Sequence, residues 1–117
     1  MSGKREAVRR YYDLVDEERY QELFDLFAGD VVYERPGQDP LEGIAEFERF
    51  YLEDRPLKDG SHTLYDVVIE GDTAAVRGSF SGRQNGESVT FGFADFHTFD
   101  ESGKIAFRYT YTDRDTV

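Results

Sequence analysis

Three ionisable side chains stand where they could act together: Arg35 ends a short apolar run, and Asp95 and His97 lie two residues apart in an aromatic run. Residues two apart in a strand point to the same face, so Asp95 and His97 are predicted to be neighbours. A carboxylate beside an imidazole can transfer protons, and a guanidinium is a permanent cation that binds anionic oxygen. These residue types indicate acid-base chemistry on, or binding of, a small, mostly apolar molecule that carries a carbonyl or similar oxygen.

Strand alternation predicts the direction in which Arg35 points. If Tyr33 faces inward, Arg35 does too, and Glu34 faces the other way. An arginine stays protonated and has no acceptor, so it cannot be a general base. An ionised Asp95 among phenylalanines requires a cationic partner, for which Arg35 is a candidate and Arg108 a competitor. Such a pair would keep the aspartate ionised.

Each of these residues also has a purely structural interpretation. Tyr11 could be a core tyrosine whose hydroxyl reaches a backbone carbonyl. An ion pair between Arg35 and Asp95 could serve stability alone, since buried pairs also occur far from chemistry. His97 could be a satisfied pocket or surface histidine. His62 is predicted to be an exposed turn residue.

The sequence lacks the usual signatures of metal, cofactor and nucleophile sites. It contains no cysteine, and its two histidines, His62 and His97, are too far apart to show a metal-ligand spacing. No glycine-rich loop precedes a predicted helix, which leaves no phosphate-binding motif. We therefore expect no metal, no cofactor and no serine or cysteine nucleophile.

The charge balance narrows the set of partners. The chain has 25 acidic and 14 basic residues, which gives a formal net charge of −11. Phosphate backbones and anionic membranes would be repelled, so we expect neither nucleic acid nor membrane as a partner. Only three of the basic residues are lysine. This surface suggests adaptation to high salt, and a soluble acidic protein without such adaptation is the alternative.

The length and the N-terminus predict the organisation and location of the chain. Its 117 residues are enough for one domain with a real core, and no linker or repeat divides residues 1–117. No basic stretch precedes an apolar run at the N-terminus, and no apolar run approaches the roughly 20 residues of a membrane span. We therefore expect one cytoplasmic domain.

The first half of the chain reads as helices around one short strand. Apolar residues at helical spacing predict a helix over residues 4–16 and a second from Tyr20 to Phe27, ended by Gly29. A strand over residues 31–33 stops at a proline-glycine loop, and a third helix follows Gly43.

The second half has the period of two that strands require. From His62 onward, Thr63, Tyr65 and Val67 are expected to share one face. The next strand has Ala74, Val76, Gly78 and Phe80 in alternation, Asn85-Gly86 predicts a hairpin, and two further strands cover 89–99 and 105–111. Together these strands predict a four-strand antiparallel meander. Glycines at 78, 82 and 92 are expected where the sheet bends or another segment approaches closely. The predicted fold class is α+β, with three N-terminal helices packed in a strongly curved mixed or antiparallel sheet, a cone-shaped half-barrel with a central pocket.

Four segments carry a resemblance to a known family. The runs AVRRYYDLV, LFAGDVVYERPG, PLEGIAEFERFY and FADFHTFDESGKI resemble, in order and spacing, the SnoaL-like and ketosteroid-isomerase-like branch of the nuclear-transport-factor-2-like superfamily. The resemblance covers nearly the whole chain. It implies the cone-shaped fold (a cystatin-like roll), a pocket for a small molecule and a homodimer. The scaffold hosts isomerases, cyclases, hydrolases and binding modules, so it does not define one activity.

Ketosteroid isomerase, a standard example of carboxylate chemistry, uses an aspartate base and an oxyanion hole of a tyrosine and a protonated aspartic acid. The resemblance places its tyrosine at Tyr11 and its protonated acid at Asp95. At the position of its base, before the proline, this sequence has Arg35. The resemblance therefore implies that the oxyanion donors are present and that the usual base is replaced.

The predicted site combines these residues. Tyr11, Asp95 and His97 are the catalytic candidates, and Arg35, Tyr33, Phe93 and Arg108 are predicted to bind the ligand. Proton transfer of the isomerase or cyclase type is one prediction, and a non-catalytic ligand-binding or dimerisation module is the alternative. A homodimer would cover the outer sheet face around Phe96, and a solvated face rich in threonines, Thr110 among them, would favour a monomer.

Overall fold

The computed structural model describes residues 3–55 and 57–113. Its first half contains α1 (Gly3–Asp16), α2 (Tyr20–Phe24), β1 (Phe27–Glu34), β2 (Leu41–Glu42), α3 (Ile44–Arg49) and the π-helical turn η1 (Phe50–Asp54). Its second half contains four long strands, β3 (Leu57–Glu70), β4 (Thr73–Gln84), β5 (Glu87–Phe99) and β6 (Ile105–Thr112). The fold is α+β, which confirms the predicted class.

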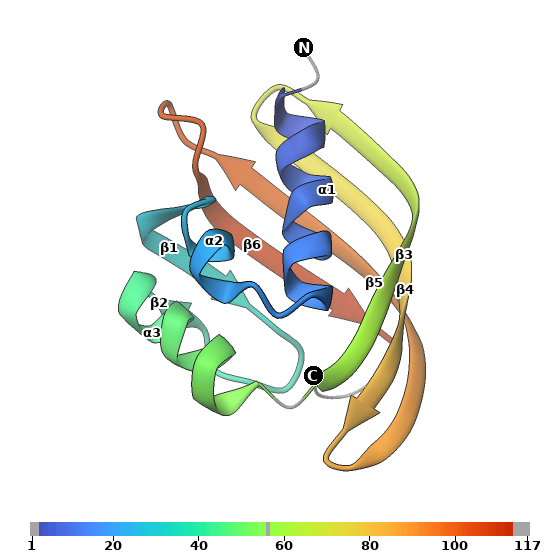
Figure 1. The fold of residues 1–117 in the computed structure, drawn as a ribbon. Helices are drawn as coiled ribbons and strands as arrows, with labels where there is room; N and C mark the ends of the chain where they lie inside the picture. Colours follow the sequence, from blue (N-terminus) through green and yellow to red (C-terminus); the bar gives the residue numbers. More distant parts are fainter. Residues whose placement is uncertain (1–2, 56, 114–117) are drawn as a thin grey trace.

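The strands form one mixed, strongly curved sheet in the order β2-β1-β6-β5-β4-β3. Strands β3 to β6 form the predicted antiparallel meander, and β1 pairs in parallel with β6. Helix α1 crosses the concave face, and α3 packs beside β1 (Figure 1). The core lies between the helices and this concave face, where one side of α1 is buried.

The second helix is shorter than predicted. It ends at Phe24, and Phe27 instead begins β1, opposite Ile105 of β6. The Phe27 ring lies 4.3 Å from that of Phe47 in α3, so Phe27 is buried as a strand residue that packs against a helix. Because apolar spacing of three and four residues fits both arrangements here, the spacing alone placed the boundary wrongly.

Strand β3 carries a bulge that the period of two does not reveal. Its pairing with β4 shifts between Leu64 and Asp66. Thr63 and Tyr65 are therefore exposed, whereas Val67 is half-buried. The prediction that these three residues share a face is wrong, because one inserted residue moves later side chains to the other face.

Two of the three predicted glycines lie at close approaches between strands. A Cβ on Gly78 would lie 2.2 Å from the carbonyl oxygen of Thr63, and one on Gly82 would lie 2.7 Å from the Cα of Gly60. A Cβ on Gly92 would meet no atom nearer than 3.9 Å. Strands β3 and β4 thus come together where side chains are absent, which lets this part of the sheet bend.

A second irregularity determines the faces of β6. The pairing with β5 shifts between Thr98 and Phe99, so Ile105 is buried but the following residues are displaced by one position. As a result, Arg108 and Thr110 point to the concave face. The prediction of an outward Thr110 is wrong. The convex face instead carries a row of aromatic side chains: Phe96, Phe107, Tyr109 and Tyr111.

Within the described ranges, no helix has the length and apolar character needed to cross a membrane.

Candidate functional site

The register of β5 and β6 brings four polar side chains together on the concave face. Asp95 lies opposite Thr110, and His97 lies opposite Arg108. Because side chains two apart share a face, these two cross-strand pairs form a polar patch inside an otherwise aromatic core. Asp95, His97 and Arg108 are almost completely buried.

Asp95 accepts three hydrogen bonds. Arg108 Nη2 donates to Oδ2 over 2.8 Å, Thr110 Oγ1 donates to Oδ1 over 2.6 Å, and the Tyr12 hydroxyl also donates to Oδ2. Burial alone would raise the pKa of Asp95, but the Arg108 charge and the donated hydrogen bonds outweigh it and lower the pKa. Asp95 is therefore ionised and cannot donate a hydrogen bond to an oxyanion.

The cation paired with Asp95 is Arg108, the competitor in the sequence prediction, and not Arg35. The Arg108 guanidinium lies between two rings, with Cζ 4.5 Å from the Tyr11 centroid and 4.4 Å from the Tyr33 centroid. Its Nε and Nη1 atoms are buried without a hydrogen-bond partner among the described residues. Burial lowers the pKa of Arg108, but Asp95 outweighs that effect and raises it, so the pair stays charged.

A second chain of donors reaches Asp95 through Thr110. The Tyr33 hydroxyl lies 3.0 Å from Thr110 Oγ1. Thr110 has one hydroxyl hydrogen, which it gives to the carboxylate, so Tyr33 is the donor in this contact. Tyr33 thus helps to hold the carboxylate from a strand that lies far away in the sequence.

His97 lies behind this network. Its Nε2 is 3.1 Å from the Tyr12 hydroxyl, and because that hydroxyl donates to Asp95, His97 Nε2 is the donor. The Nδ1 atom is buried without a partner in the described part of the chain. Burial and the Arg108 charge lower the pKa of His97 to about 3, so the ring is neutral at physiological pH.

The hydroxyls of Tyr11 and Tyr51 are hydrogen-bonded to each other. Burial raises the pKa of Tyr11 well above its usual value and that of Tyr51 to about 12, so both are protonated. One of their two hydrogens makes the mutual bond, which leaves one hydrogen for another acceptor. The pair can therefore donate a hydrogen bond to a bound molecule.

Arg35 faces inward, as strand alternation predicts, and is half-exposed. Its Cζ lies 4.1 Å from the centroid of the Phe50 ring, and its Nη2 reaches the Asp39 carbonyl at 3.5 Å. No carboxylate among residues 3–55 and 57–113 pairs with it, and its buried Nε has no partner there. Desolvation lowers the pKa of Arg35, although an arginine remains charged. Glu34 points outward, toward Tyr109.

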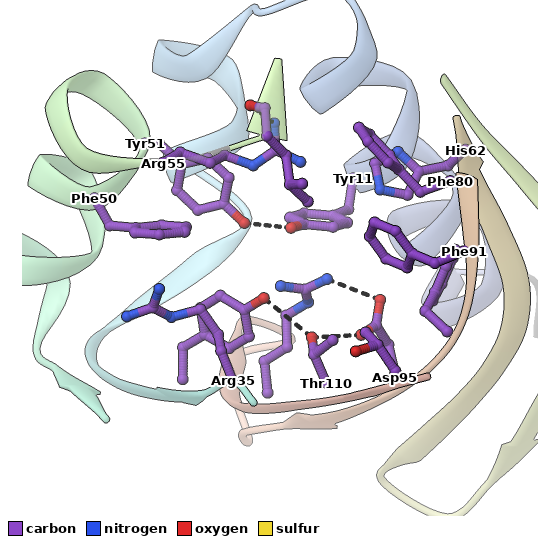
Figure 2. Close-up of a pocket in the computed structure, with 15 residues that line it drawn as sticks. Tyr11, Arg35, Phe50, Tyr51, Arg55, His62, Phe80, Phe91, Asp95 and Thr110 are labelled. Atoms are coloured by element: carbon purple, nitrogen blue, oxygen red, sulfur yellow. Dashed lines mark hydrogen bonds and ion pairs between the residues drawn. The ribbon is translucent and has the colours of Figure 1, made fainter. Parts of the chain in front are cut away.

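These side chains surround a cavity with an empty volume of about 420 Å³, part of which is open to solvent (Figure 2). Arg35 and Phe50 lie on one side, and His62, Phe80 and Phe91 lie on the other (Figure 2). Its lining includes the predicted residues Tyr11, Tyr33, Arg35, Phe93, Asp95 and Arg108, together with residues that the sequence did not indicate, Tyr51, Arg55, His62, Thr110 and Thr112. His97 does not line it.

The prediction for His62 is wrong, because this residue lies within β3 and lines the cavity. Its Nδ1 is 2.6 Å from Asp16 Oδ1, and its backbone N–H donates to Asp16 Oδ2 over 2.8 Å. The His62 side chain is only 8% exposed. One sequence signal could have indicated this pair. His62 begins the alternating pattern of a long strand, where an inward side chain can reach the end of the first helix.

No group of three or more histidines, cysteines or carboxylates within reach of one metal ion occurs in the described part of the chain. The polar groups of the cavity are instead three guanidiniums, several phenol hydroxyls, one ionised carboxylate and one imidazole. This set can bind an oxygen-bearing molecule and move protons on it.

The cone formed by the curved sheet and its helices is the fold of the nuclear-transport-factor-2-like proteins, and a family model described as the SnoaL-like domain matches residues 8–108. The chain belongs to the SnoaL-like family, as its sequence resemblance implied. A comparison with curated proteins found no match.

Solved structures of the same fold have varied descriptions. A nuclear-transport-factor-2-like protein of unknown function from Exiguobacterium is 25% identical, with a TM-score of 0.78 over 92% of this chain and 98% of that one. An LEH-like epoxide hydrolase from M. tuberculosis is 15% identical, with a TM-score of 0.84 over 97% and 84%. SalBIII, an epoxide hydrolase/cyclase-like enzyme with a role in pyran ring formation in salinomycin, is 20% identical, with a TM-score of 0.81 over 93% and 89%.

Proposed function

We propose that this chain binds a small, mostly apolar molecule in its conical cavity, through an oxygen atom that is negative or becomes negative. The observation that carries the proposal is the cation excess in the cavity wall. Three arginines, Arg35, Arg55 and Arg108, line a cavity that contains a single carboxylate, Asp95, which Arg108 binds. Arg35 has no carboxylate partner among the described residues. In an aromatic cavity of a strongly acidic protein, such an excess favours an anionic or electron-rich oxygen.

The proposed chemistry is proton transfer of the isomerase or cyclase type. Tyr11, supported by Tyr51, donates a hydrogen bond to the ligand oxygen, and Arg35 stabilises the negative charge that develops there. Arg35 stands where ketosteroid isomerase has its base, so the reaction does not follow that enzyme's proton path. Asp95 keeps about one unoccupied lone-pair position and can accept a proton or orient Arg108. His97 acts through Tyr12. Two solved relatives, an LEH-like epoxide hydrolase and an epoxide hydrolase/cyclase-like enzyme, have activities that are compatible with this chemistry.

A thermal-shift screen tests the proposal. A library of steroids, polyketides and aromatic acids is screened against the wild type and Arg35→Ala, at low and high salt. Ligands that raise the melting temperature of the wild type and not of the variant place the binding site at Arg35. If no compound shifts the wild type, or if each shift is the same in the variant, the proposal is wrong. Arg49→Ala, an exposed arginine outside the cavity, is the matched control.

A non-catalytic ligand-binding or dimerisation module is the second candidate, and the aromatic row of the convex face favours it. Phe107 stacks on Tyr109 at 4.9 Å, and Phe96 and Tyr111 are 42% and 57% exposed. Apolar rings exposed together on one sheet face are typical of a protein interface. We propose a homodimer that buries this face.

Sedimentation of the wild type and Phe96→Asp tests the dimer. We expect the wild type to sediment as a dimer and the variant as a monomer, because a buried carboxylate without a partner is costly. Ser88→Asp, at the other end of β5, is the control. A monomeric wild type, or a dimeric Phe96→Asp variant, would contradict the proposal.

We also propose that the protein works in the cytoplasm of a cell with a high salt concentration, to which its acidic surface is adapted. In that case its melting temperature should rise with the concentration of potassium chloride.

A further inference from the structure

We infer that His62, oriented by Asp16, is a catalytic base of the cavity. The inference rests on the proposed function and names the residue that moves the proton. It concerns two residues that none of the sequence-based candidates includes, one at the end of α1 and one near the start of β3.

Asp16 fixes His62 at two points. One carboxylate oxygen is 2.6 Å from the ring Nδ1, and the other accepts the backbone N–H of His62 at 2.8 Å. The carboxylate thus holds the strand and the ring at the same time, which sets the ring orientation. A carboxylate only accepts, so the ring carries its hydrogen on Nδ1 when neutral, and Nε2 is left with a free lone pair.

Nothing in the described ranges occupies that lone pair. No hydrogen bond to His62 Nε2 is formed there, and the side chain lines the cavity with Phe80 and Phe91 (Figure 2). The rings of Tyr12, Phe80 and Phe93 surround the imidazole at centroid distances of 5.1, 5.0 and 5.5 Å. Asp16 is the charged group in contact with the ring, and Arg55 lies beyond it, 5.9 Å from the Phe80 centroid.

The other two candidates are less suited to take a proton. Asp95 already accepts three hydrogen bonds that lower its pKa, which makes it a weak base. His97 does not line the cavity, and its Nε2 hydrogen is given to Tyr12. His62 combines a free acceptor atom, contact with the cavity and a carboxylate that stabilises the imidazolium.

The step is a proton transfer without a co-reactant. His62 Nε2 takes a proton from a carbon next to a carbonyl group, and the C–H electron pair moves toward the carbonyl oxygen, which becomes an enolate. Arg35, on the side of the cavity opposite His62, and Tyr11, between the two sides, stabilise that oxygen (Figure 2). The imidazolium, held by Asp16, then returns the proton to a different atom of the same molecule, which completes an isomerisation.

The elimination of 5-nitrobenzisoxazole is a suitable probe, because it needs only a base in an apolar site. The base takes the proton on C3, the N–O bond breaks as the nitrile forms, and the oxygen leaves as the yellow 2-cyano-4-nitrophenolate. We compare the wild type with H62Q, D16N and D13N. Asp13 is an exposed residue of α1, so D13N removes the same charge as D16N without touching the ring.

We expect H62Q and D16N to lower kcat/KM by about 10²-fold or more, the usual contribution of a general base. D13N should stay within about twofold of the wild type, as for most surface substitutions. In D16N, the amide donates to Nδ1 and moves the hydrogen to Nε2, which ¹⁵N NMR can detect because the chain has only two histidines.

Binding of the product phenolate separates the two proposals. If the wild type and H62Q bind the phenolate equally and also turn over the probe at equal rates, His62 is not the base. The proposed binding function of the pocket then still stands. A wild type that binds the phenolate but does not exceed the buffer rate also overturns the inference. If the wild type does not bind the phenolate, and Arg35→Ala does not change any ligand-induced shift in the thermal-shift screen, the proposed function is wrong. D16N keeps the question testable if H62Q does not fold.

Discussion

Two of the three guanidiniums that line the cavity, those of Arg108 and Arg35, are held in opposite ways. Arg108 is buried between two tyrosine rings and bound to Asp95, which in turn is held by Thr110 and Tyr12. Arg35, on the other side, is half-exposed and rests on Phe50 with no carboxylate at hand in the described chain. Both arginines are positively charged and line the same cavity, but only the charge of Arg108 is neutralised by a carboxylate of the described chain.

The difference separates a cation that maintains the fold from one that is available to a ligand. A buried charge is tolerated only with a partner, so Arg108 and Asp95 depend on each other. A half-exposed cation keeps part of its hydration and needs no partner for stability. Substitutions on the Arg108 side should therefore change folding, and substitutions at Arg35 should change binding.

The largest effect is expected for Asp95→Ala. It leaves Arg108 buried and unpaired, which costs about 3–5 kcal/mol of unfolding free energy. Urea denaturation measures this loss. The double variant Asp95→Leu/Arg108→Met removes both charges and should recover most of it, because a buried pair can be replaced by apolar groups. A loss below about 1 kcal/mol for Asp95→Ala would contradict the contrast.

The next effect is the acid sensitivity that His97 confers. Its pKa is about 3 in the folded protein and 6.5 as an unperturbed group, so the unfolded chain binds more protons between these values. Stability is therefore lost as the pH falls from 6.5 toward 3, by about 2 kcal/mol between pH 7 and pH 5. His97→Gln should show a shallower loss over this range in pH-dependent urea denaturation. If the dependence of unfolding free energy on pH is the same in His97→Gln and the wild type, His97 binds its proton equally well in the folded and unfolded states, which would contradict the prediction.

A smaller effect is expected for Thr110→Val, which keeps the shape but removes the donor between Tyr33 and Asp95. The loss of unfolding free energy should be about 1–2 kcal/mol, because a buried carboxylate and a phenol each lose a partner. Thr98→Val, on the exposed face of β5, should stay within about 0.5 kcal/mol. Equal losses in the two variants would show that the Thr110 hydroxyl does not support Asp95.

The smallest effect on stability is expected for Arg35→Ala. It removes the contact with Phe50, which is worth about 0.5–1 kcal/mol, and a long hydrogen bond to the Asp39 carbonyl. The same variant is predicted to lose ligand binding. The thermal-shift screen should therefore show a large effect on binding, whereas urea denaturation should show a small effect on stability. A loss above about 2 kcal/mol would make Arg35 a structural residue and remove the contrast with Arg108.

The fold was largely predictable because it rests on patterns with a definite period. The alternation along β4 and β5, the Asn85-Gly86 hairpin and the apolar stripe of α1 were all read correctly. Two of the errors fall where one residue breaks the period: at the bulge before Asp66 and at the register shift that precedes Arg108. A single inserted residue hardly changes the sequence pattern, but it moves every later side chain of the strand to the other face of the sheet.

The candidate site was predictable only within single strands. Alternation placed Arg35 inward and Asp95 beside His97, and family resemblance placed Tyr11 in the cavity. The partners on other elements were missed or left open, since spacing along the chain carries no information on pairing across it. The contact between Asp16 and His62 spans 46 residues, and the choice of Arg108 over Arg35 depended on β6 register.

The parallel pairing of β1 with β6 has a consequence for how the protein is made. Tyr33 and Thr110 meet across 77 residues, so this side of the cavity cannot assemble until Thr110 has left the ribosome. Until then Asp95 lacks its guanidinium partner. Closing so long a loop is slow, which makes docking of the last strand the natural rate-limiting event of folding and the moment at which the cavity comes into existence.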